Sequence, residues 1–116
     1  MFALNFQSPY HREMLLTRAK NCTIRLGDVR DNYPENSIVW ITFGTKFRTR
    51  QKLYTAIIDK ILLKQFSQLT TEDLAHQNPE LKSVDELISF FERLYGGTIT
   101  LNDYVSVIYF SEVVGE

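Results

Sequence analysis

The apolar segment at residues 53–63 strongly constrains what this chain can fold into. Its sequence is LYTAIIDKILL, and we interpret it as one long strand that bends. Residues 2–7 alternate between apolar and polar side chains, which predicts a first strand, and further strands are predicted at 22–26, 37–43 and 104–110. We expect the last of these strands to lie near the middle of the sheet.

Helix signals fall between these strands. Ser8-Pro9 supplies an N-cap and a proline suited to the first helical position, and predicts a helix that ends near Ala19. Two further helices are predicted, at 70–77 and from a capping box at residue 83 to a glycine pair at 96. In the second, an apolar stripe is predicted to face the core, formed by Leu87, Ile88, Phe90, Phe91 and Leu94. The order of elements does not repeat the strand-helix alternation of a doubly wound sheet. We therefore predict an α+β fold, a small mixed β-barrel with about three helices at its ends.

Size and composition favour one ordered domain over residues 1–116. The chain has 116 residues, of which 44% are hydrophobic, enough for a single core. It has no apolar run of membrane-spanning length and no signal pattern at its N-terminus, so we expect a cytoplasmic protein without a membrane partner. One cysteine and two histidines do not make a zinc site, and neither metal nor other cofactor is expected. The oligomeric state stays open.

The charges are distributed unevenly along the chain. Residues 1–52 hold nine Lys or Arg against four Asp or Glu, whereas residues 53–116 hold four against ten. The net charge of -1 therefore hides a basic half and an acidic half. This asymmetry predicts a basic face for an anionic partner.

A lysine, a hydroxyl and a guanidinium follow the first helix at Lys20, Thr23 and Arg25. We place Lys20 in a tight turn and the other two on one face of a strand, because strand side chains alternate with period two. Together they suit a phosphate, a carbonyl or the edge of a nucleobase. The alternative is that Lys20 and Arg25 only solvate a turn and an edge strand.

A second basic group lies in a predicted hairpin turn, where Lys46, Arg48, Arg50 and Lys52 surround Phe47. The four cations would follow a nucleic-acid backbone, and Phe47 or Tyr54 would offer a stacking surface. The alternative is an exposed hairpin kept soluble by charge.

Several of these segments, taken in order and spacing, resemble the ASCH (activating signal cointegrator homology) domain family. The most specific part is Lys20 followed by Thr23-Ile24-Arg25; the others are Asn5-Phe6, Tyr10, Leu15-Leu16, Leu26-Gly27-Asp28, the strands around Val39-Trp40 and at 105–110, and the helix start at Leu69-Thr70. The resemblance implies a PUA-like β-barrel. It also implies RNA or nucleoside binding in a cleft between the barrel and the helices, lined by the Lys20, Thr23, Arg25 and Gln77 positions.

Some bacterial ASCH proteins are amidohydrolases that remove the acetyl group of N4-acetylcytidine, and the resemblance places their lysine and threonine at Lys20 and Thr23. Their glutamate aligns with Gln77, which cannot exchange a proton near neutral pH. Glu72 or Glu80 would replace it if the alignment shifts. The sequence therefore favours an RNA- or nucleoside-binding domain, with an amidohydrolase of acylated nucleosides as the alternative and little support for a plain protein-interaction domain.

Four further residues need an interpretation. The family commonly has a glycine before the lysine turn, where this chain has Arg18, so the helix must end in another geometry or the turn is more cationic. Tyr10 and Trp40 are interpreted as core residues rather than ligand-stacking ones. His11 is interpreted as a surface or helix residue rather than a catalyst.

Overall fold

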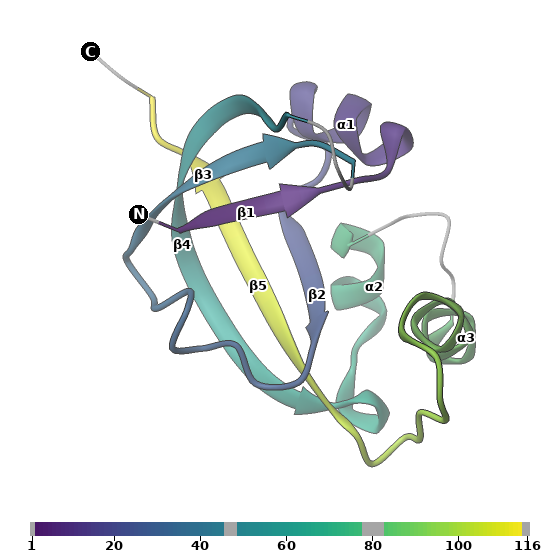
Figure 1. Cartoon of the computed structure of the whole chain (residues 1–116). Coiled ribbons are helices and arrows are strands. Elements are labelled where there is room, and N and C mark those ends of the chain that lie inside the picture. Colours follow the sequence, from purple (N-terminus) through teal and green to yellow (C-terminus); the bar gives the residue numbers. More distant parts are fainter. Residues whose placement is uncertain (1, 46–48, 78–82, 115–116) are drawn as a thin grey trace.

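The computed structural model describes residues 2–45, 49–77 and 83–114. Its elements follow the predicted order: β1 (Ala3–Phe6), α1 (Pro9–Leu16), β2 (Cys22–Leu26), β3 (Ile38–Phe43), β4 (Gln51–Gln65), the 3-10 helix η1 (Phe66–Gln68), α2 (Thr71–Gln77), α3 (Val84–Tyr95) and β5 (Tyr104–Glu112). Figure 1 shows that the three α-helices gather on one side of a curved sheet. No helix in the described ranges is long and apolar enough to cross a membrane.

The sheet is mixed and has the strand order β1-β3-β4-β5-β2. Only β1 and β3 pair in parallel; the other three pairs are antiparallel. β5 lies between β4 and β2, inside the sheet as predicted. The long strand β4 shifts register against β5 between Ile58 and Lys60, so Asp59 forms a bulge at which β4 bends.

The curvature of the sheet brings its two edge strands close together. On β2, Arg25 donates from Nη2 to the main-chain oxygen of Asn5 on β1, at 2.9 Å. No ladder joins these two strands in the described part of the chain, and we call the gap between them the seam. The result is a partly open barrel, and the candidate functional site lies at this seam.

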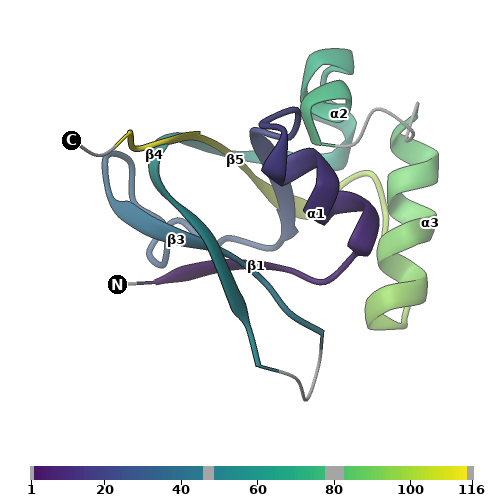
Figure 2. The same ribbon diagram turned by 90° about the horizontal axis from the view of Figure 1, so that it is seen from above.

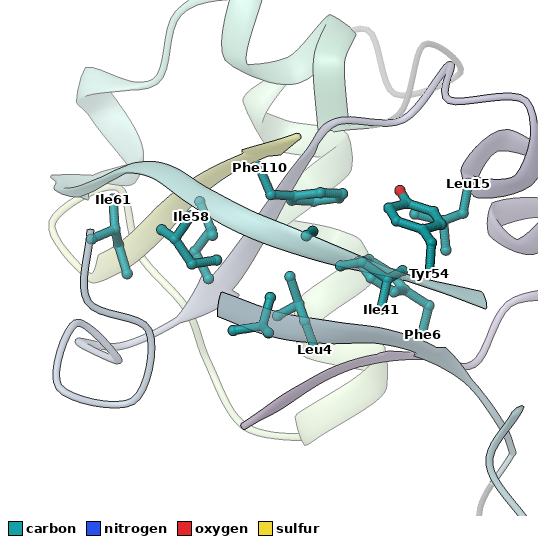
Figure 3. Close-up of a cluster of buried hydrophobic side chains, with 11 residues drawn as sticks. Leu4, Phe6, Leu15, Ile41, Tyr54, Ile58, Ile61 and Phe110 are labelled. Carbon is teal, nitrogen blue, oxygen red and sulfur yellow. The ribbon is translucent and has the colours of Figure 1, made fainter. Parts of the chain in front are cut away.

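β5 is buried on both faces, which divides the core into two clusters. Ile108 and Phe110 point into the barrel, where they pack with Leu4, Phe6, Leu15, Ile41, Tyr54 and Ile58 (Figure 3). Val105 and Val107 point the other way and pack under the helices with Cys22, Ile24, Phe66, Leu74, Leu87 and Phe91. Helices α2 and α3 must therefore cover β2 and β5, because both strands carry apolar side chains on that outer face.

Local signals explain where α3 begins and ends. The Ser83 side chain accepts a hydrogen bond from the Glu86 main-chain nitrogen at 3.2 Å, as expected for an N-cap. At the other end Gly96 has φ 75°, a left-handed conformation that glycine adopts at low cost. The helix buries Leu87 and Phe91, four residues apart, against the outer cluster.

The prediction that the first helix ends near Ala19 is wrong. α1 ends at Leu16 and Arg18 follows with φ 63°, in the left-handed position that glycine usually fills. The Arg18 side chain offsets this strain. It makes two hydrogen bonds to the Glu112 carboxylate, at 3.0 and 2.8 Å, and its guanidinium lies 3.9 Å from the centre of the Tyr54 ring.

Tyr10 and Trp40 do not lie in the core, although the sequence predicted both there. Each is 44% exposed. On β3, Val39 and Ile41 take the inward positions, so the alternation of the strand turns Trp40 outward. On α1 the buried positions belong to Met14 and Leu15.

One buried carboxylate joins α2 to two strands. Asp73 accepts hydrogen bonds from Tyr109 Oη on β5 at 2.6 Å and from Lys64 Nζ on β4 at 2.7 Å, and it also caps the Thr70 main-chain nitrogen at 3.1 Å. Burial alone would raise the pKa of Asp73, but the hydrogen bonds from Lys64 and Tyr109 outweigh it and hold the pKa below its usual range.

We predict that Asp73→Ala lowers the free energy of unfolding by about 2 to 4 kcal/mol, because it leaves a half-buried ammonium and a phenol without their acceptor. Urea unfolding followed by circular dichroism measures the change. Asp28→Ala is the control: it breaks an ion pair to Arg30 at 2.8 Å, in which both side chains are exposed, and should leave stability unchanged. Equal losses in the two variants would contradict the prediction.

Candidate functional site

A pocket of about 360 Å³ opens at the seam. Its lining comes from the end of β1, the start of α1, β2 and α3: Asn5, Phe6, Gln7, Ser8, His11, Thr23, Ile24, Arg25, Phe90, Phe91, Leu94 and Tyr95. Figure 2 shows how β1, α1 and α3 are arranged. Its volume falls in the range of pockets that hold small ligands. The pocket therefore has the position that a cleft between barrel and helices requires.

Arg25 supplies the fixed charge of this pocket. Its Nε donates to Thr23 Oγ1 at 3.3 Å, its Nη2 donates to the Asn5 oxygen, and its guanidinium lies 5.2 Å from the centre of the Phe6 ring. Nη1 makes no hydrogen bond to any residue that the structure describes, and is left to a ligand. Burial lowers the pKa of Arg25, but a guanidinium stays charged at neutral pH.

Lys20 lies behind the pocket rather than in its lining. The side chain is 1% exposed, its Nζ donates to the Cys22 main-chain oxygen at 2.7 Å, and it lies 5.4 Å from the centre of the Phe6 ring. Burial lowers the pKa of Lys20 to about 7, with a further contribution from the charge of Arg25. The ammonium therefore exchanges its proton near neutral pH, unlike an exposed lysine.

His11 is a pocket residue that the sequence analysis did not identify. It is half-buried on α1 and its ring meets the Phe6 ring edge to face, with centres 6.4 Å apart. Burial, followed by the charges of Lys20 and Arg25, lowers the pKa of His11 to about 4. The imidazole is therefore neutral at physiological pH, and no local pattern in the sequence signals this.

The wall opposite Arg25 comes from the apolar side of α3. The sequence assigned Phe90 and Leu94 to a core stripe, but they are 37% and 59% exposed, and Tyr95 is 58% exposed. The apolar residues of α3 cover more of the helix than the outer cluster can bury. That excess is the signal in the sequence that could have identified the wall.

The polar lining of the pocket combines the Arg25 cation with neutral side chains. The Asn5 amide is already used, because Nδ2 donates to the Gly44 oxygen at 3.1 Å and Oδ1 accepts from Thr42 Oγ1 at 2.8 Å. No carboxylate occurs among the lining residues that the structure describes. Within the same residues no cluster of His, Cys, Asp and Glu could hold a metal ion. The pocket therefore suits a flat ligand that carries acceptors or negative charge.

The remaining predicted site residues belong to the β3–β4 hairpin and to α2. Arg50 and Lys52 are exposed beside the β3–β4 hairpin, and Lys52 Nζ lies 5.1 Å from the centre of the Trp40 ring. Lys46 and Arg48 lie outside the described residues. Gln77 is the last residue of α2. Thr23 and Arg25 are thus the predicted residues that line the pocket, with Lys20 directly behind them.

Solved structures with this fold exist, although their sequences are distant. An Enterococcus faecalis protein of the DUF984 family, EF3133, matches with a TM-score of 0.72 and 11% identity over 97% of this chain and 81% of its own. An ASCH domain from Lactobacillus crispatus matches with a TM-score of 0.66 and 13% identity over 95% of this chain and 77% of its own. The protein PH0355 matches with a TM-score of 0.62 and 16% identity over 95% of this chain and 100% of its own.

These similarities establish the fold. The chain has an ASCH-like fold, a small α+β PUA-like barrel with three α-helices, as the sequence predicted. No protein-family model matches the sequence, and no curated protein matches it. At identities below one in five, the similarity does not carry an activity or a ligand to this chain.

The lowered pKa of His11 predicts how stability depends on pH. The pKa of His11 is about 4 in the folded state and 6.5 in the unfolded chain. At pH values between these two, the unfolded chain binds more protons than the folded one. His11 should therefore make stability fall as the pH drops from 6.5 to 4. Thermal unfolding of the wild type and of His11→Gln over this range checks it: the variant should lose less stability with acid. Parallel curves for the two proteins would show that the prediction is wrong.

Proposed function

We propose that this protein binds single-stranded RNA or a nucleoside, with a base in the seam pocket. The observation that carries the proposal is the position of the Arg25 guanidinium. It is held by contacts with Asn5, Thr23 and Phe6, and exposed aromatic residues of α3 line the same pocket. A nucleobase offers the two features that this arrangement selects, a flat π-face and acceptor atoms on its edge. The ASCH-like fold supports the proposal, since the resemblance of the sequence implies the same kind of ligand.

Charge and stacking would share the binding energy. Phe90 and Tyr95 are exposed at the pocket and would stack on a base, a contact that tolerates different sequences. Arg25, with Lys20 behind it, would attract a phosphate or a carbonyl oxygen. The hairpin with Arg50 and Lys52 is tied to the pocket at its base, where Asn5 bonds to Gly44, so the backbone of a longer strand would continue toward it. Such binding should weaken as salt rises, because neutralised phosphates release counterions.

We predict that Arg25→Lys weakens the binding of a mixed-sequence ten-nucleotide RNA at least about tenfold. The substitution keeps the positive charge but removes the planar guanidinium, which bonds two protein acceptors and also faces the ligand. We expect the free energy of binding to weaken by roughly 1.5 kcal/mol or more. Fluorescence anisotropy at low and high salt measures it. Arg30→Lys changes an exposed arginine outside the pocket and should bind as the wild type does.

Because Arg25 also crosses the seam, folding of each variant is verified by circular dichroism. Tyr95→Ala is the second variant, because the exposed Tyr95 side chain contributes little to the core. It should weaken binding through lost stacking. The proposal fails if the wild type does not bind RNA or nucleoside, or if folded Arg25→Lys and Tyr95→Ala both bind as tightly as the wild type.

The environment of Lys20 favours a second candidate, an amidohydrolase of N4-acetylcytidine or a similar acylated nucleoside. Lys20 is buried, its pKa is lowered to about 7, and its Nζ bonds the carbonyl of the residue that precedes Thr23. In this reaction the neutral amine of Lys20 would accept the hydroxyl proton of Thr23 as its oxygen attacks the acyl carbon. The ammonium would return that proton to the amide nitrogen as the C–N bond breaks and cytidine leaves, and water would then hydrolyse the acetyl ester on Thr23. Arg25 would stabilise the resulting oxyanion.

The pH dependence of this reaction is predicted by the pKa of Lys20. Release of cytidine from N4-acetylcytidine should rise as the pH increases through about 7, because the amine then loses its proton. Lys20→Met and Thr23→Val should both abolish turnover, whereas Arg30→Lys should retain it. Chromatography of the product measures the rate. Absence of cytidine at high enzyme concentration between pH 6 and 9 would exclude this candidate for that substrate.

A further inference from the structure

A second hollow adjoins the seam pocket. It has a volume of about 350 Å³ and is lined by Leu26, Gly27, Gly96, Gly97, Thr98, Ile99, Asp103 and Tyr104. None of these residues was singled out as a site residue by the sequence analysis. We call it the second hollow.

The pocket and the second hollow share two chain segments. One is β2 with the residue that follows it, and the other is the end of α3 with the two glycines that follow it. On β2, Thr23 to Arg25 line the pocket, and the next two residues line the second hollow. From α3, Leu94 and Tyr95 line the pocket, and Gly96 and Gly97 line the second hollow. Two residues along a strand advance by roughly 7 Å, which is about the step between neighbouring nucleotides in an extended strand. The two hollows therefore lie next to each other along β2 and the C-terminal end of α3.

The second hollow offers a stacking surface and an acceptor. Tyr104 is 51% exposed, and its ring meets no other aromatic ring in the part of the chain that the structure describes. Asp103 uses Oδ2 to accept from the Thr100 main-chain nitrogen at 2.8 Å, and its Oδ1 accepts no hydrogen bond from the described residues. An exposed aromatic ring beside a carboxylate suits a base and a ribose, whereas the carboxylate repels phosphate.

Glycine keeps this hollow open. Gly27, Gly96 and Gly97 have φ values of 82°, 75° and 79°, a conformation that other residues adopt only with strain. A Cβ added at any of the three would meet no atom within 4 Å, so the space over the backbone is empty. Gly27, Gly96 and Gly97 therefore line the second hollow with main chain alone, which a flat ligand can approach closely.

We infer that the second hollow holds the nucleotide next to the one whose base occupies the pocket. This inference rests on the proposed function and extends it: the ligand is a strand of at least two nucleotides rather than a free nucleoside. The second base stacks on Tyr104, and Asp103 Oδ1 accepts a hydrogen bond from a ribose hydroxyl or an exocyclic amine of the base.

The test compares ligands of one and two nucleotides. Isothermal titration calorimetry measures the binding of nucleoside monophosphates and of dinucleotides of each of the four bases. For the wild type the second nucleotide should strengthen binding. Tyr104→Ala should weaken dinucleotide binding about fivefold or more and leave monophosphate binding unchanged, whereas Tyr104→Phe should retain both. Leu101→Ala is the matched control, because Leu101 is 48% exposed but does not line the hollow.

Two results would overturn the inference, and they can be told apart. If Tyr104→Ala binds dinucleotides as the wild type does while Arg25→Lys weakens them, the second hollow is not a nucleotide site and the proposed function stands. If neither monophosphates nor dinucleotides bind the wild type, the proposed function fails and the inference fails with it.

Discussion

The guanidinium of Arg25 crosses the seam between the two edge strands of the sheet. Its side chain is half-buried, and a charge removed from water is costly unless it is hydrogen-bonded. The main-chain oxygen of Asn5 and the hydroxyl of Thr23 provide those bonds, and the Phe6 ring lies beside the group. The contact that holds β2 near β1 thus also fixes the guanidinium of a residue that lines the pocket. Because these partners belong to strands, the polar end of the pocket is rigid before any ligand arrives.

The double burial of β5 explains why an aromatic wall faces this charge. Val105 and Val107 require cover on the outer face of the sheet, and α3 provides it with Leu87 and Phe91. A helix that buries these two side chains presents its neighbouring positions to the edge of the sheet, where the seam lies. Phe90 and Tyr95 are therefore exposed beside Arg25 as a consequence of how the outer cluster is packed.

The sequence predicted the features of this fold that follow from local patterns. Strand alternation placed Thr23 and Arg25 on one face, and the length of β4 signalled a bend that the bulge at Asp59 provides. It could not predict features that depend on contacts between distant segments. Lys20 resembles a solvated turn residue until Phe6 and the Cys22 carbonyl are placed around it, and the shift in the pKa of His11 arises from burial and two cations on other segments. The sequence places the α3 residues of the pocket wall in the core, because periodicity identifies an apolar helix face but does not show how much of that face is covered.

Lys20 gives the two candidate functions opposite dependences on pH. Its pKa of about 7 reflects burial together with the neighbouring charge of Arg25. A bound phosphate would offset that neighbouring charge and favour the ammonium, so attraction of an anion is strongest below pH 7. Hydrolysis needs the neutral amine, which predominates above pH 7. A single buried lysine thus separates binding from catalysis, because the protonation state that supports one of them opposes the other.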